Sequence, residues 1–257
     1  MKICCIIPAR YNSTRLPGKP LLKINNKELL WLTYNIARKV IKEDDIYIFT
    51  DSEKILSRFK NIKNIFLSKK PFFNGTERAS HGVKYLKKNY DASVILSCDN
   101  PFLDKKAIIE TIKSYKEIKN DPRYCAGTVH CKNNGVENNR YVAKLVADEN
   151  NDVMYISRNS IPYKKINNKF FYTHHGLVCI KIKFLKKYIF FKNTPLQIAE
   201  DNEWLKFLEL GFKIRTRLIK KIAQEVNIKK DLDYYRSKYS FVKYNWTFCS
   251  NYNFQFY

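Results

Sequence analysis

Short apolar runs alternate with segments of helical spacing over the first 120 residues of the chain. The runs are bounded by polar residues, which is typical of buried strands, and the longer segments repeat apolar residues every three or four positions, which is typical of helices. The expected strands cover residues 2–7, 46–50, 65–68 and 93–98, and the expected helices cover residues 27–41, 76–89 and 106–118. This order predicts an α/β fold with a mainly parallel sheet flanked by helices.

The pattern changes between residues 120 and 182, where segments of strand character follow one another with only loops between them. This succession predicts an antiparallel β insertion. Helical spacing returns at residues 196–210 and 229–238. We therefore expect one domain over residues 1–235, with the β-rich insertion at about 120–182, and an aromatic C-terminal extension at 236–257.

The loop after the first strand carries Arg10, Arg15 and Lys19 within the proline-bounded segment "IIPARYNSTRLPGKPLL". In parallel sheets, ligands bind beyond the carboxyl ends of the strands. The segment lacks both common phosphate-loop patterns, but two guanidinium forks and a compact ammonium suit phosphate oxygens. The prolines stiffen the loop and so lower the entropy lost on binding. On charge alone, a solvated basic turn is an equal alternative.

The chain is strongly basic, with 48 Lys and Arg against 24 Asp and Glu and a net charge of +24. Such a field attracts polyanions, which include nucleic acid, acidic membranes and phosphorylated substrates. The basic residues are scattered, however, and the abundance of Lys, Asn, Ile, Tyr and Phe is typical of AT-rich coding. No motif that reads RNA or DNA is present, so the charge alone does not favour a nucleic-acid partner.

The seven cysteines are odd in number and show no C-x-x-C spacing, so a zinc cluster is not predicted. Free thiols are the simplest interpretation and indicate a reducing compartment. The first apolar run is too short for a signal peptide, and no window approaches the ~18 apolar residues of a membrane span. We expect a soluble, cytoplasmic protein without a membrane partner.

Residues 7–21 resemble the opening signature of the 3-deoxy-manno-octulosonate cytidylyltransferases, also called CMP-KDO synthetases, throughout their length. Further segments similar to that family follow in order, and together they span roughly residues 3 to 235. They are "NGTERAS" at 74–80, "LSCDNP" at 96–101, "SRNSIPY" at 157–163, "HHG" at 174–176, "TPLQIAEDNEWLK" at 194–206 and "EVNIKKDLD" at 225–233. The resemblance implies the fold of the nucleotide-diphospho-sugar transferases and a homodimer in which the β-rich insertion takes part.

The resemblance also implies a reaction. The anomeric hydroxyl of a 2-keto-3-deoxy sugar acid attacks the α-phosphate of CTP, and pyrophosphate leaves. Such a reaction depends on positioning of the substrates and neutralisation of their charge more than on covalent catalysis. The product would be an activated acidic sugar, of the kind that lipopolysaccharide biosynthesis uses. Mg²⁺ is the implied cofactor.

Matching positions suggest the site residues. The expected catalytic residues are Arg10, Lys19 and Asp99. The residues expected to bind CTP are Ala9, Arg10, Ser13, Arg15, Lys19 and Arg78. Sugar binding falls to Arg158, His174, Glu203 and Trp204, and metal binding to Asp99 and Asn227. Structural alternatives exist for three of these residues. Asp99 could cap the following turn, Arg78 could pair with an acid on its helix, and His174 could be a satisfied buried histidine.

The chain departs from the family pattern at several positions. Ser97, Cys98 and Asn100 stand in place of Gln, Gly and Glu, and Trp204 in place of Gln. The Tyr expected shortly after H-I-G corresponds to Val178. Because hydrogen-bonding pockets discriminate strongly between substrates, these changes favour a modified octulosonate or a nonulosonate as an alternative sugar.

The expected second metal ligand, an Asp, corresponds to Asn227. Asn can still offer a carbonyl oxygen to a hard cation, but one negative charge is lost. Glu225, Asp231 and Asp233 lie close in sequence and leave the alignment open here. An enzyme with altered metal affinity and a weakened homologue are both compatible with this change. The rival hypothesis from another class is a non-catalytic binding protein.

Overall fold

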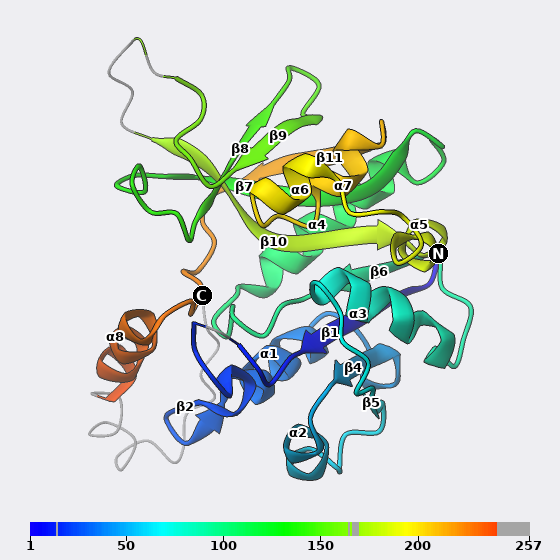
Figure 1. The fold of residues 1–257 in the computed structure, drawn as a ribbon, viewed down its shortest axis with the longest axis vertical. Helices are drawn as coiled ribbons and strands as arrows, with labels where there is room; N and C mark the ends of the chain where they lie inside the picture. Colours follow the sequence, from blue (N-terminus) through cyan, green and yellow to red (C-terminus); the bar gives the residue numbers. More distant parts are fainter. Residues whose placement is uncertain (14, 164, 166–169, 241–257) are drawn as a thin grey trace, which may run out of the picture.

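The structure is a computed structural model and describes residues 1–13, 15–163, 165 and 170–240. A nine-stranded mixed sheet forms its centre, with the strand order β11-β7-β10-β6-β1-β4-β5 and with β8 and β9 joined at the side of β10 (Figure 1). The strands are β1 Ile3–Ala9, β4 Ile46–Thr50, β5 Ile65–Leu67, β6 Ala92–Ile95, β7 Tyr124–Asn133, β8 Ala143–Ala147, β9 Val153–Ser157, β10 Phe171–Lys181 and β11 Lys213–Ile219. A small hairpin, β2 Lys23–Ile24 with β3 Lys27–Glu28, stands apart.

Eight α-helices surround the sheet in the part of the chain that the structure describes. They are α1 Leu29–Arg38, α2 Glu53–Arg58, α3 Gly75–Gly82, α4 Lys105–Ile118, α5 Ile182–Tyr188, α6 Pro195–Ala199, α7 Leu205–Glu209 and α8 Lys229–Ser240. Three short 3-10 turns are η1 Lys19–Leu21, η2 Glu43–Asp45 and η3 Val83–Tyr85. None of the helices in the described ranges is long and apolar enough to cross a membrane.

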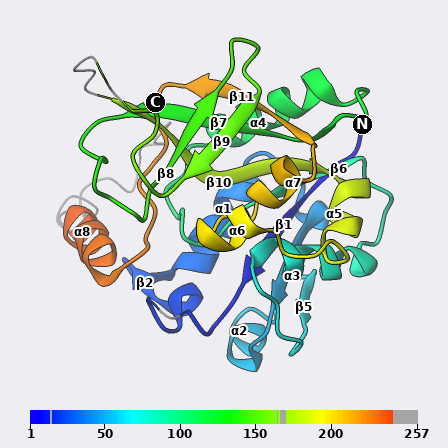
Figure 2. The same cartoon turned by 45° about the horizontal axis from the view of Figure 1, so that its top comes forward.

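Two hydrophobic cores lie on opposite faces of the sheet, because successive side chains of a strand point in opposite directions. In β1, Cys5 and Ile7 belong to the core that α1 and α4 cover, whereas Cys4 and Ile6 belong to the core that α3, α5 and α7 cover. Figure 2 shows α5, α6 and α7 in front of the sheet and α4 behind it. All seven residues of β1 are at least half-buried, as expected of a central strand covered on both faces.

The first half of the chain confirms the predicted parallel architecture. β1 pairs in parallel with β4 and β6, and β4 pairs in parallel with β5. The expected antiparallel part also exists, since β10 pairs antiparallel with β6, β7 and β8. Its strands β7 and β10 belong to the central sheet, and β11 joins the same sheet by parallel pairing with β7.

Several expected helix boundaries move for local reasons. The helix expected from Thr76 begins at Gly75, because the Asn74 side chain caps it by accepting the Glu77 amide at 2.8 Å. The single helix expected at 196–210 is split into α6 and α7, and residues 200–204 between them form part of the site described below. α8 continues past the domain boundary expected at 235, and residues 241–257 lie outside the described residues.

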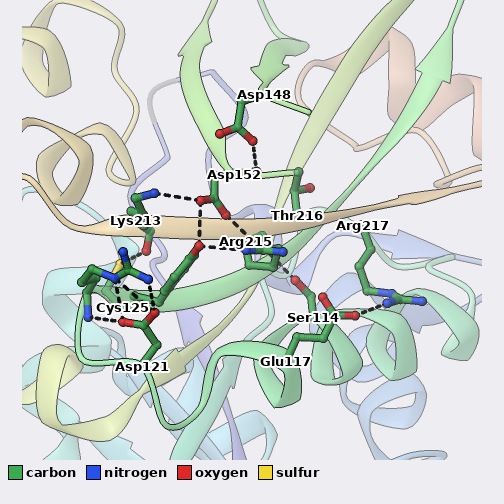
Figure 3. A network of polar contacts seen from close by, with 12 residues as sticks. Ser114, Glu117, Asp121, Cys125, Asp148, Asp152, Lys213, Arg215, Thr216 and Arg217 are labelled. Carbon is green, nitrogen blue, oxygen red and sulfur yellow. Dashed lines mark hydrogen bonds and ion pairs between the residues drawn. The ribbon is translucent and has the colours of Figure 1, made fainter. Parts of the chain in front are cut away.

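A polar network fixes the outer strands of the sheet (Figure 3). Asp152, which is 6% exposed, accepts a hydrogen bond from the Tyr124 hydroxyl at 2.7 Å. The same carboxylate pairs with Lys213 at 3.1 Å and with Arg215 at 2.8 Å. Asp152 directly precedes β9 and joins the start of this strand to β7 and β11. Because the carboxylate has two cations and a hydroxyl around it, its burial is compensated.

The cysteines in the described part of the chain are free and buried, as the sequence predicts. Burial raises the pKa of Cys4 to about 12, so this thiol stays protonated at neutral pH. Such buried thiols behave as small apolar side chains. Cys249 lies outside the described residues.

Candidate functional site

A cavity of about 300 Å³ opens at the carboxyl ends of β1 and β6, where ligands bind in sheets of this class. Eleven of the twelve site residues expected from the sequence line it, and ten of them are expected to bind CTP or the sugar or to act in catalysis. These are Arg10, Ser13, Arg15, Lys19, Arg78, Asp99, Arg158, His174, Glu203 and Trp204. Asn227, the expected second metal ligand, also lines it. The remaining residue, Ala9, is fully buried in the core and does not line the cavity.

Two main-chain hydrogen bonds to a single carbonyl group hold the opening loop together. The Tyr11 carbonyl oxygen accepts the amides of Ser13 at 2.9 Å and Gly18 at 3.0 Å. Gly18 has a φ of 66°, a conformation that favours glycine, and it leads directly into η1. Lys19, at the start of η1, is only 9% exposed. The loop is therefore rigid through its main chain as well as through its prolines.

Lys19 joins this loop to the turn after β6. Its ammonium nitrogen lies 3.2 Å from Oδ2 of Asp99. The other carboxylate oxygen of Asp99, Oδ1, is buried and has no hydrogen-bond partner. Burial would raise the pKa of Asp99, but the attraction of the Lys19 ammonium outweighs it, so the pKa is lowered. Asp99 is thus ionised at neutral pH and has one oxygen available to a cation.

Arg78 holds a second part of the opening loop through Asp51. Its side chain is 4% exposed, and its guanidinium lies 3.0 Å from Oδ2 of Asp51. Oδ1 of Asp51 accepts the Tyr11 amide at 2.9 Å. The expected alternative, a pair between Arg78 and an acid on its own helix, is not what the structure contains. Arg78 instead links α3, the exit of β4 and the opening loop.

A second cavity of about 610 Å³ shares Arg10 and Arg78 with the first. Its lining includes Lys54, Lys69 and Lys70. Arg10 and Arg78 therefore line both cavities, and the lysines of the second cavity add to the positive charge beside the first.

The connection between β11 and α8 forms the opposite wall. The Val226 amide donates to the Asp99 carbonyl at 2.7 Å, which ties this connection to the turn after β6. The Asn227 side-chain amide donates to Oε2 of Glu225 at 3.0 Å. Burial and the nearby charge of Asp99 raise the pKa of Glu225. Glu225, which directly precedes Val226, is thus attached to the turn that carries Asp99.

The other two carboxylates near position 227 have other roles. Asp231 accepts the main-chain amides of Asn227 at 2.8 Å and of Ile228 at 3.0 Å, and so it caps the start of α8. Asp233 pairs with Arg236 along the helix at 3.7 Å, and its side chain is 53% exposed. Neither residue lines the first cavity.

Arg158 organises the wall opposite the opening loop. Its guanidinium donates to the carbonyls of Tyr141 at 3.1 Å, Glu200 at 3.2 Å and Asp201 at 3.0 Å. The Glu200 carboxylate in turn accepts the Arg158 amide at 2.7 Å. Three of the five guanidinium N–H groups are used in this way, so at most two remain for a ligand. This geometry fixes the fork at the edge of the cavity.

His174 is held on both sides of its ring. Nε2 lies 3.0 Å from the Thr128 hydroxyl, and Nδ1 accepts the Gly176 amide at 3.4 Å. The Thr128 hydroxyl donates to the Leu177 carbonyl at 2.7 Å, so Nε2 is the protonated nitrogen. Burial lowers the pKa of His174 to about 3, with a contribution from nearby cationic groups. The ring is neutral, and its predicted contact with the sugar stays a prediction.

Glu203 and Trp204 occupy the break between α6 and α7. Oε2 of Glu203 accepts the Thr76 amide at 2.9 Å, at the start of α3. Burial raises the pKa of Glu203 despite this bond. Trp204 is 2% exposed and packs in the core beside α5 and α7 while also lining the cavity. The helix break thus places an acid and a large apolar ring on the same wall.

Two of the departures from the family pattern lie away from the cavity. Val178 is fully buried in β10, where it pairs with Ile95 and Thr128. Asn100 is 3% exposed and does not line the cavity. Ser97 and Cys98 do line it. Only some of the substitutions that were expected to alter the sugar pocket therefore lie in the cavity.

The described residues contain no group of three or more His, Cys, Asp or Glu side chains that could hold a metal by themselves. The residues present nevertheless fit Mg²⁺, which commonly binds through one or two carboxylates together with substrate phosphates. The observation that supports this fit is the buried Oδ1 of Asp99, which has no partner. Asp99 is the residue that would hold the ion.

Sequence reasoning missed several residues of the site. Asp51 was not among the expected site residues, although it directly follows β4, the strand next to β1, and this position at the carboxyl end of a strand could have indicated the site. Tyr141, Asp201 and Asn202 also line the cavity. Tyr141 lies in a segment without a periodic pattern, and the other two fall where the sequence predicts an uninterrupted helix. Glu225 appeared only as a neighbour of Asn227.

Comparisons with known proteins agree on one family. The sequence profile described as Cytidylyltransferase matches residues 4–236. The 3-deoxy-manno-octulosonate cytidylyltransferase of Arabidopsis thaliana, named as mitochondrial, is 32% identical over 238 residues, which cover 90% of this chain and 81% of that protein. The enzyme of the same name from Fusobacterium nucleatum is 33% identical over 84% of this chain and 87% of its own length.

A solved structure has the same fold. CMP:2-keto-3-deoxy-manno-octonic acid synthetase, described as complexed with CTP, superposes with a TM-score of 0.83 at 23% identity and covers 94% of this chain and 100% of its own. A cytidylyltransferase structure from Leptospira borgpetersenii gives a TM-score of 0.59 at 16% identity. The likeness in fold and the matched profile lead to the same assignment, and the chain belongs to the cytidylyltransferase family.

Proposed function

We propose that the protein transfers CMP from CTP to the anomeric hydroxyl of 3-deoxy-manno-octulosonate or a close relative and releases pyrophosphate. The observation that supports this most directly is the 3.2 Å contact between Lys19 and Asp99. It joins a loop suited to phosphates with a carboxylate suited to a metal, inside one cavity. Relatives about 30% identical over most of the chain are named for this reaction.

The opening loop would bind the triphosphate. Arg10 and Arg15 can bind phosphate oxygens as forks and Lys19 as a compact charge, and all three line the cavity. As pyrophosphate leaves, negative charge develops on its oxygens, and fixed cations stabilise that charge without having to reorganise. The Arg78–Asp51 pair would keep the loop in the required position.

The opposite wall would bind the sugar acid. Arg158 retains donors for a carboxylate after it has bonded three carbonyls. Glu203 and Trp204 would contact the sugar ring. Since Trp204 offers no hydrogen-bond acceptor, a sugar with fewer hydroxyl groups at that position is the second candidate, and a deoxy- or amino-modified ulosonate or a nonulosonate fits this description.

Mg²⁺ is the proposed cofactor, held by Asp99 with the phosphates of CTP. When bound, it would neutralise charge on the triphosphate. A homodimer and a cytoplasmic location are also proposed, from the resemblance and from the buried free thiols. Light scattering of the purified protein tests the dimer.

The reaction is tested by measuring pyrophosphate release from CTP and Mg²⁺ with a panel of octulosonates and nonulosonates. ATP, GTP and UTP serve as alternative nucleotides. We expect turnover with CTP and one class of sugar acid, lost in Asp99→Ala. A matched control is Asp233→Ala, which removes a carboxylate outside the first cavity and should leave turnover unchanged.

If the wild type binds CTP but releases no pyrophosphate with any sugar of the panel and metal in excess, the result would contradict the transferase proposal and favour a binding protein. A nucleic-acid binder would show affinity that falls steeply with salt and is indifferent to Asp99→Ala. Activity with another nucleotide would retain the reaction class and change the substrate.

A further inference from the structure

Asp99 has one oxygen paired with Lys19 and one buried oxygen without a partner. A single carboxylate with a cation already beside it is a weak site for a divalent ion, because charge count and ligand number set the affinity. A second anionic oxygen ligand near Asp99 would strengthen it. The described residues on the facing wall offer such a group, although position 227 itself carries the neutral Asn.

Of the acidic side chains near Asn227, Glu225 is the one that lines the cavity. Asp231 is occupied with two main-chain amides at the start of α8. Asp233 is exposed and paired with Arg236. Glu225 has 18% of its side chain exposed, and its carboxylate has polar contacts with the Asn227 side-chain amide and the His175 ring.

The main chain holds Glu225 next to Asp99. Val226 follows Glu225 directly and donates its amide to the Asp99 carbonyl at 2.7 Å. The carboxylate itself is oriented by Asn227 at 3.0 Å and by the His175 ring at 3.7 Å. Both contacts come from residues that also line the cavity. Partners of this kind fix the direction of a metal ligand.

We propose that Glu225 supplies the second carboxylate for the divalent cation that accompanies CTP, and that Asn227 acts by orienting it. This inference rests on the proposed function, since the cation is the one that the triphosphate brings. With Asp99 and Glu225 on opposite sides, the ion would be bound by one carboxylate from the turn after β6 and one from the β11–α8 connection.

The test is the gain in CTP affinity that Mg²⁺ produces, measured by calorimetry on the full chain with Mg²⁺ and with EDTA, without sugar acid. Glu225→Gln should reduce this gain by about tenfold or more. Its metal-free CTP affinity should be unchanged or higher, because a negative charge near the triphosphate is gone. This second measurement also establishes that the variant is folded.

Two further variants complete the experiment. Asn227→Asp in the Glu225→Gln background should restore much of the metal-dependent gain, because a carboxylate returns to the same wall. Glu149→Gln, the same substitution at an exposed position of the β8–β9 hairpin, should match the wild type. Asp99→Asn should lose the gain as Glu225→Gln does.

A wild-type gain in Glu225→Gln, together with a lost gain in Asp99→Asn, would overturn the role of Glu225 and leave the proposed function standing. A wild type that binds CTP without any gain from Mg²⁺ would overturn it as well. Failure of the wild type to bind CTP under either condition would overturn both the inference and the proposed function.

Discussion

The Arg78 guanidinium of α3 lies 3.0 Å from the Asp51 carboxylate at the exit of β4, and the same carboxylate accepts the Tyr11 amide at 2.9 Å. A buried pair thereby controls the conformation of the loop that carries the phosphate-binding cations. The pair therefore positions the loop in addition to stabilising the fold, because the Asp51 carboxylate binds the main chain of the loop at Tyr11.

Arg78→Ala should therefore impair both stability and nucleotide binding. Removing one partner of a buried pair leaves the other charge uncompensated, which costs about 3 kcal/mol. Urea unfolding should register this loss, and KM for CTP should rise. Lys69→Ala removes one partner of the exposed Lys69–Glu53 pair and should leave unfolding unchanged. An Arg78→Ala protein with wild-type stability and KM would contradict the role of the pair.

Asp99→Asn should separate activity from stability. Loss of the carboxylate should lower kcat by about 100-fold or more, because charge stabilisation at the reacting phosphate is lost. Stability should change by less than about 1 kcal/mol, since losing the pair with Lys19 is offset by relief of repulsion with Glu225. Asp104→Asn keeps a good helix cap for α4 and should affect neither quantity. Strong destabilisation of Asp99→Asn would show that Asp99 is mainly structural.

Gly127→Ala should destabilise the sheet on the α4 face. A Cβ atom at Gly127 would lie 2.3 Å from the main-chain nitrogen of Tyr115, and a main chain cannot move aside as a side chain can. Overpacking of this kind costs about 3 kcal/mol or more. At Gly211, with a φ of 80° and open space around it, alanine should cost only about 1 kcal/mol of backbone strain. Equal losses for the two variants in urea unfolding would contradict this difference.

Acidification should unfold the protein partly through His130. This side chain is 4% exposed and lies 2.8 Å from the Thr216 hydroxyl, and burial lowers its pKa to about 4. The unfolded chain binds a proton near pH 6.5, so the free energy of unfolding should fall as pH drops from about 6.5 to about 4 and level off below that. His130→Gln should flatten this part of the stability curve, and an unaltered slope would contradict the assignment.

The sequence predicted the first half of the fold because its strands are short, fully apolar and bounded by polar turns. Ile46–Thr50 shows this well, since all five residues are buried and the predicted bounds match the observed strand. The second half was less predictable. β7 and β10 carry polar residues such as His130, Thr173 and His174, which are buried by pairing within the sheet, and no local pattern indicates that these strands extend the central sheet.

The residues of the site also fall into a predictable and an unpredictable group. Arg10, Lys19 and Asp99 could be predicted because they lie in the loops that follow two expected strands, where a motif and the fold class agree. The contacts of Glu225 could not be predicted from the sequence, because they depend on the hydrogen bond between Val226 and Asp99. A long-range main-chain contact of this kind leaves no periodic pattern. The helix break at residues 200–204 was missed for another reason. The segment reads as continuous helix, and the bond from the Thr76 amide to Glu203 within the break is a long-range contact that leaves no local pattern.

The bond from Val226 to Asp99 also has a consequence for synthesis of the protein. The phosphate-binding loop and the first carboxylate leave the ribosome early, whereas the wall that completes the cavity is made near the end of the described chain. Contacts between segments so distant in sequence form late, because a long loop must close before they are gained. A nascent chain can thus build most of its parallel sheet while it still lacks the complete site, and chains truncated before Glu225 would lack its wall altogether.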